Sequence, residues 1–225
     1  MLTLDDIHST AHAAVSVLAT SGIIACLVGS AAGSEHGITR TPNDVDILVL
    51  SGSETMNPAE IKNLLVSKDP RFFLEKPATN PNASYLVLKY RLASLSQMNY
   101  CCHVDIFFPG MIHLPTIPPS YIFYSAQTAL PIMPFFPILL HKIQAWIAHR
   151  ASSKESARIK QSNDVQDIRE LLALAVSAHK IKLDEQTWLP AWFLQEAVQG
   201  VVQYVQEHPE TIPLWKESGF PMSIE

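Results

Sequence analysis

The sequence predicts an α+β protein in which a small mixed β-sheet flanked by helices is followed by a C-terminal helical module. Three observations lead to this prediction. The first half alternates helical hydrophobic spacing with short apolar strands, the middle is rich in proline, and the last third shows helical spacing alone. We therefore expect an α+β domain at residues 1–135 and a helical module at residues 136–225.

The N-terminal elements are a helix and a buried strand. Residues 4–21 carry apolar side chains at helical spacing, and Gly22 is a natural stop for a helix. The run IIACLVG at residues 23–29 is predicted to be a buried strand that ends in glycine. A short polar loop with room for one helical turn follows it.

A second strand and a helix come next. The run DVDILVL at residues 44–50 alternates as a strand does. Residues 57–69 are predicted to form a helix, because Asn57 is a good N-cap residue and Pro58 suits the first helical position.

The middle of the chain holds two strands and a proline-rich segment. Residues 84–92 and 100–108 are predicted strands, and the seven residues between them suit a hairpin connection. Residues 109–137 are expected to be irregular but packed on the core, because their composition is apolar. After this segment, helices are predicted at residues 138–149, 155–178 and 190–207.

Composition excludes several classes of protein. The formal net charge of −5 and the absence of a long basic run argue against a broad electrostatic nucleic-acid binder. Three cysteines without zinc-site spacing are interpreted as reduced, buried thiols. The apolar stretch before His141 contains seven prolines, so we expect no membrane helix there, and a cytoplasmic protein is the prediction.

Two carboxylates share one face of the predicted strand at residues 44–50. Since side chains alternate along a strand, Asp44 and Asp46 point to the same side, and Val45 and Ile47 to the other. Two neighbouring carboxylates repel each other unless a cation lies between them. Mg²⁺ is a suitable cation, because it binds one or two carboxylates together with phosphate oxygens and water.

A third carboxylate lies in a largely uncharged, apolar stretch of the sequence. From Leu92 to His141 the chain has no Lys, Arg or Glu, and its one Asp is Asp105. An ionised carboxylate among apolar side chains is costly without compensation. If the strand of Asp105 lies beside that of Asp44 and Asp46, the three acids form one cluster that can hold two Mg²⁺ ions.

Each carboxylate also has a simpler interpretation. Asp44 can cap the turn before the strand, Asp46 can pair with a surface lysine, and Asp105 can pair with His103 or an arginine. His103 itself either orients Asp105 or is a core histidine. Arg40 is interpreted as part of a solvated loop, with a place in a nucleotide pocket as the alternative.

A glycine-serine turn follows the first buried strand. Gly29 allows the backbone to approach a ligand closely, and the backbone N–H groups and the Ser30 hydroxyl can hold phosphate oxygens.

This combination resembles the DNA polymerase β-type nucleotidyltransferase superfamily. The similarity consists of Gly29-Ser30, thirteen further residues, Asp44-Val45-Asp46, and a later strand that bears Asp105. It covers roughly residues 23–108, and the order of the elements agrees as well.

The C-terminal helices are similar to those of the abortive-infection toxin type of nucleotidyltransferase. The family pattern is a Lys, an Ala and an Arg, followed later by Asp-x-x-Asp before an apolar run. The corresponding residues are Lys142, Ala145, Arg150, Asp164 and Asp167. The spacing from Lys142 to Asp164 is longer than in the family.

The resemblance implies Mg²⁺-dependent transfer of a nucleoside monophosphate from a nucleoside triphosphate, with ATP among the candidates. Gly29 and Ser30 would hold the β- and γ-phosphates, and Asp44, Asp46 and Asp105 would bind two Mg²⁺ ions. Asp105 is also a candidate general base.

Lys142 would reach the triphosphate, and its alternative role is an exposed helix cation. The acceptor stays open between an RNA end, a protein hydroxyl and a small molecule such as an aminoglycoside. The alternative function is a non-catalytic nucleotide-binding or scaffold protein on the same fold.

Overall fold

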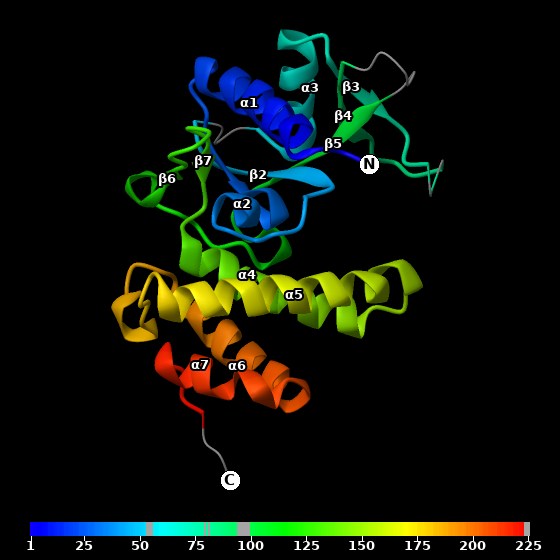
Figure 1. Ribbon diagram of the computed structural model, residues 1–225. Coiled ribbons are helices and arrows are strands. Elements are labelled where there is room, and N and C mark those ends of the chain that lie inside the picture. The colour runs from blue at the N-terminus through cyan, green and yellow to red at the C-terminus, as the bar shows by residue number, and fades with distance from the viewer. Residues whose placement is uncertain (53–55, 79, 81, 94–99, 223–225) are drawn as a thin grey trace. The chain divides into compact units, whose positions relative to one another are not determined.

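The computed structural model describes residues 1–52, 56–78, 80, 82–93 and 100–222 (Figure 1). The chain divides into two compact units. Unit 1 consists of Met1–Glu35, Arg40–Met111 and Ile117–Met133, and unit 2 of His36–Thr39, Ile112–Thr116 and Pro134–Glu225.

Unit 1 is a seven-stranded mixed sheet flanked by helices, in the order β3-β4-β5-β2-β1-β7-β6. Its elements in chain order are α1 (Leu4–Thr20), β1 (Ile24–Val28), α2 (Gly29–Glu35), β2 (Asp44–Ser51), α3 (Pro58–Lys68), β3 (Phe72–Glu75), β4 (Val87–Arg91), β5 (Cys101–Phe107), β6 (Phe123–Tyr124) and β7 (Pro131–Ile132). Strand β5 runs parallel to β2, and β7 runs parallel to β1, while the other neighbours are antiparallel. Figure 1 shows α1 and α3 on one side of the sheet and α2 on the other. The predicted fold class is confirmed.

Capping residues fix the helix starts in unit 1. The Asn57 side chain accepts hydrogen bonds from the backbone N–H groups of Ala59 and Glu60, and Pro58 occupies the first turn, as predicted. Thr3 and Asp6 form a reciprocal capping box at the start of α1. Polar caps therefore set where both helices begin.

The prediction of an irregular segment at residues 109–137 is wrong in part. This stretch contains β6 and β7, and β7 extends the sheet beside β1 through the pair Leu27 and Ile132. The Met133 N–H donates to the carbonyl of Leu27 at 2.9 Å. Strands of two residues are too short to show a period of two, and β7 begins with a proline, which explains why neither strand was predicted from the sequence.

The predicted pairing of the strands near residues 84–92 and 100–108 is present. Strands β4 and β5 are antiparallel neighbours, with Leu88 opposite Val104. Residues 94–99 of the predicted hairpin connection lie outside the described residues. The sequence did not predict β3, which pairs with β4 on the outer side.

Unit 2 is helical. Its helices are α4 (Phe135–Ala151), α5 (Glu155–Ser177), α6 (Ala191–Glu207) and α7 (Ile212–Glu217), of which α7 was not predicted. Helix α4 packs against both α5 and α6, and Trp146 of α4 meets Tyr204 of α6 edge to face at 5.1 Å between ring centres. Most of α4 is buried, so it forms the core of unit 2.

Membrane-spanning character is absent from the helices that the structure describes. None of them combines the length and the apolar composition needed to cross a bilayer.

Candidate functional site

The three predicted carboxylates lie on adjacent strands of unit 1. Strands β2 and β5 are parallel neighbours, and their register places Asp46 opposite Asp105 and Asp44 opposite His103. Neighbouring strands are about 4.8 Å apart, and residues at paired or alternate positions share a face. Asp44, Asp46 and Asp105 therefore occupy one face of the sheet.

The opposite face of the same strands forms the core of unit 1. Val45, Ile47, Val104 and Ile106 are buried, whereas the three carboxylates are only partly buried. Asp105 thus lies in an apolar sequence without lying in the apolar core. His103 is exposed, so the interpretation of His103 as a core histidine is wrong.

Gly29 lies directly against the Asp46 carboxylate. Its φ angle is +62°, and a Cβ atom at this position would lie 2.1 Å from Asp46 Oδ2. Strand pairing produces the contact, because Val28 is the register partner of Asp46. A glycine is required here both for the backbone angle and for the space.

Replacing Gly29 with alanine should be much more costly than replacing Gly22. Gly22 also has a positive φ of +76°, but a Cβ there meets nothing within 4 Å. Gly22→Ala should therefore cost about 1 kcal/mol for the backbone alone. Gly29→Ala should cost roughly 1–3 kcal/mol more, because the methyl group collides with Asp46. Urea unfolding of the two variants measures this difference, and equal costs would contradict the contact.

The Ser30 hydroxyl contacts Arg40, a residue expected to lie in a solvated loop. The Arg40 guanidinium donates a hydrogen bond from Nη2 to Ser30 Oγ, and Arg40 is partly buried. The interpretation of Arg40 as part of a solvated loop is therefore wrong, and its alternative beside the glycine-serine turn fits the contact. The signal available in the sequence was its place four residues before Asp44.

The donor set of this face suits a hard cation. Among the residues that the structure describes, no group of three or more His, Cys, Asp or Glu side chains is arranged so that it could hold a metal ion. Mg²⁺, however, takes one or two carboxylates from a protein and completes its shell with phosphate oxygens and water. The paired carboxylates of Asp46 and Asp105, with Asp44 on the same face, fit that requirement.

Lys142 belongs to unit 2 and is buried there. Its Nζ lies 2.8 Å from Asp167 Oδ2, and the two side chains are 7% and 0% exposed. The alternative of an exposed helix cation is therefore wrong.

Asp164 and Arg150, two further residues of the helical resemblance, also have side-chain partners in unit 2. His149 Nδ1 lies 2.5 Å from Asp164 Oδ2, and burial raises the pKa of Asp164 against the opposing effect of His149. Arg150 pairs with Glu207 and lies 5.3 Å from the ring centre of Trp146. These contacts tie α4 to α5 and α6.

The buried thiols offer no nucleophile. Burial raises the pKa values of Cys26 and Cys102 to about 12, so both are protonated near neutral pH. All three cysteines are free, as predicted, but Cys101 is only partly buried, so the prediction of burial is wrong for it.

Two solved structures are similar to this chain. One is the crystal structure of an antigenic nucleotidyltransferase-like protein from Paracoccidioides brasiliensis, with 16% identity, a TM-score of 0.68, and coverage of 95% of this chain and 93% of that chain. The other is the crystal structure of JHP933 from Helicobacter pylori, with 13% identity, a TM-score of 0.52, and coverage of 97% and 82%. At these identities the likeness shows the fold alone, which is nucleotidyltransferase-like. No protein-family model and no curated protein matches the sequence.

Proposed function

We propose that this protein is a Mg²⁺-dependent nucleotidyltransferase that moves a nucleoside monophosphate from a nucleoside triphosphate to an acceptor. The observation that carries the proposal is the register of β2 and β5, which puts Asp46 beside Asp105, with Asp44 on the same face. The contact of Gly29 with Asp46 adds a glycine-serine turn at the carboxylates. The nucleotidyltransferase-like fold supports the same chemistry.

The proposed phosphate contacts come from the glycine-serine turn and from Arg40. The backbone N–H groups of Gly29 and Ser30 bind the β- and γ-phosphates, and the Ser30 hydroxyl adds a further donor. Arg40, which already contacts Ser30 Oγ, supplies a positive charge at this turn. A planar guanidinium matches phosphate oxygens well.

In the proposed reaction, the acceptor oxygen attacks the α-phosphorus while the bond to the β-phosphate breaks. Asp105 accepts the acceptor proton, and pyrophosphate leaves. Asp44, Asp46 and Asp105 would hold two Mg²⁺ ions, and bound Mg²⁺ would supply positive charge to neutralise the phosphates. The residues of the site contribute mainly orientation and charge complementarity.

The residue pattern of the C-terminal helices suggests a subtype of nucleotidyltransferase. We assign the chain to the abortive-infection toxin type on the pattern of Lys142, Arg150 and Asp167, and we keep Lys142 as a candidate triphosphate ligand. The buried ion pair of Lys142 with Asp167 favours a structural role instead. The candidate acceptors are an RNA end, a protein hydroxyl and a small molecule. We place the protein in the cytoplasm.

The test is incubation of the protein with each labelled nucleoside triphosphate and Mg²⁺. Transfer predicts pyrophosphate release and labelling of the protein or of an added acceptor, and chelation of Mg²⁺ should abolish both. Mg²⁺ with the correct triphosphate should also stabilise the fold, by about 2.7 kcal/mol at a hundredfold excess over Kd. A protein that binds none of the triphosphates would exclude the proposal.

A second candidate function is nucleotide binding without turnover. The observation that favours it is the contact between Arg40 and Ser30, which gives the turn a cation for phosphate without any metal. This function predicts the same triphosphate affinity with and without Mg²⁺, and no pyrophosphate release with any acceptor pool. The Mg²⁺ dependence of binding therefore separates the two functions.

A further inference from the structure

Helix α2 carries the glycine-serine turn at one end and a buried carboxylate at the other. The helix has seven residues and contains Ala31, Ala32 and Gly33 as its buried positions. Such small side chains bury little apolar surface, and a helix of this length is not stable by itself. Its position must therefore depend on other contacts.

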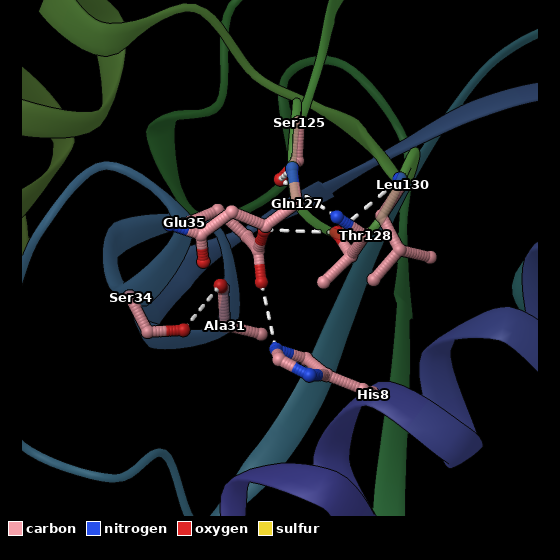
Figure 2. Close-up of polar contacts among 8 residues, drawn as sticks. All are labelled: His8, Ala31, Ser34, Glu35, Ser125, Gln127, Thr128 and Leu130. Carbon is pink, nitrogen blue, oxygen red and sulfur yellow. Dashed lines mark hydrogen bonds and ion pairs between the residues drawn. The ribbon is translucent and has the colours of Figure 1, made fainter.

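Glu35, the last residue of α2, supplies such contacts to two other segments (Figure 2). Its Oε1 lies 2.7 Å from His8 Nε2 of α1, and its Oε2 accepts a hydrogen bond of 2.8 Å from Thr128 Oγ1. The Glu35 side chain is 4% exposed, and that of His8 is 22% exposed. The contact of His8 Nε2 with Glu35 is close but does not meet hydrogen-bond geometry.

The turn that presents Thr128 has its own hydrogen bonds. Ser125 Oγ accepts from the backbone N–H groups of Gln127 and Thr128 at 3.3 Å each, and Thr128 Oγ1 accepts from the N–H of Leu130 at 3.4 Å. Figure 2 shows this turn and His8 meeting the Glu35 carboxylate from different segments. Glu35 thus ties α2 to α1 and to the turn that leads into β7.

The position of Glu35 is energetically unfavourable unless other contacts stabilise its carboxylate. A carboxylate at the C-terminal end of a helix is disfavoured by the helix dipole, and burial adds a desolvation penalty. Both oxygens have a partner from outside α2, which compensates these costs. Ser30 and Glu35 are five residues apart on a helix that rises about 1.5 Å per residue, so a shift at one end moves the other.

We propose that Glu35 is a positioning residue for the phosphate-binding turn. By fixing the far end of α2, it holds Gly29 against Asp46 and Ser30 at Arg40 in the arrangement that binds the triphosphate. The inference rests on the proposed function for what is bound. The anchoring of α2 itself is independent of that function.

The test combines hydrogen exchange with nucleotide kinetics on the full-length protein. Glu35→Ala should speed amide exchange at residues 31–35 and raise the KM for the Mg²⁺-triphosphate about tenfold or more, with a smaller change in kcat. Glu35→Gln keeps an acceptor for Thr128 and should restore most of the affinity. Thr128→Val removes only the hydroxyl donor and should give an intermediate loss.

Ser34→Ala is the matched control. Among the residues that the structure describes, the Ser34 hydroxyl bonds within the helix, to the carbonyl of Ala31 at 2.8 Å, so its loss should leave KM unchanged. The proposal is overturned if Glu35→Ala shows the KM of Ser34→Ala, or if exchange at residues 31–35 does not change. If the unmodified protein binds no triphosphate, the proposed function fails. Hydrogen exchange alone then decides whether Glu35 anchors α2.

Discussion

Asp105→Asn is expected to lower nucleotidyl transfer by at least about a thousandfold while the protein stays folded. The substitution keeps the shape of the side chain but removes the negative charge opposite Asp46 on the neighbouring strand. It also removes the group proposed to accept the acceptor proton. Because Asp105 is only partly buried, the neutral amide should not disturb the core behind it.

Pyrophosphate release and thermal unfolding measure this prediction together. Asp105→Asn should lose most of the stabilisation by Mg²⁺ and triphosphate that the unmodified protein gains. Asp5→Asn, an exposed position in α1, is the matched control and should keep both properties. A transfer rate for Asp105→Asn within tenfold of the control would contradict the assignment of the site.

Asp167→Asn is expected to lower the free energy of unfolding by about 3–5 kcal/mol, because it removes the carboxylate that pairs with a buried ammonium. That loss is a large fraction of the roughly 5–15 kcal/mol that stabilises a typical domain. The pair joins α4 to α5 in unit 2, with side chains that are 7% and 0% exposed. Lys142→Met should cost a similar amount, since it leaves the Asp167 carboxylate without its lysine.

Urea unfolding of both single variants and of Lys142→Met with Asp167→Leu tests the pair. The double variant should be less destabilised than the sum of the single variants, because an apolar pair needs no charge compensation. Costs below about 1 kcal/mol for the single variants would contradict a structural ion pair. Loss of triphosphate binding in a stable Lys142→Met protein would instead support Lys142 as a phosphate ligand.

The carboxylate face could be predicted because it depends on local rules. Alternation along a strand places Asp44 and Asp46 on one side, and the order of elements in the resemblance indicated which strand carries Asp105. The close approach of a ligand to Gly29 stays a prediction, whereas the group that the structure places against this glycine is the Asp46 carboxylate.

Several contacts were not evident from the sequence, each for its own physical reason. Arg40 reaches Ser30 through a loop, and a loop sequence carries no period from which the direction of a side chain can be read. Lys142 lies on a helix that is buried on most sides, so the usual link between charge and exposure fails there. Strand β7 joins β1 across more than a hundred residues with only two residues of its own.

The neighbouring placement of β2 and β5 also determines which insertions the molecule can tolerate. The connections that join β2, α3, β3, β4 and β5 along the chain can vary in length at a small entropic cost, because loop closure depends only weakly on loop length. One added or deleted residue inside either strand would turn its acid toward the hydrophobic interior. Length variation among natural homologues should therefore concentrate in those connections and be absent within the two strands.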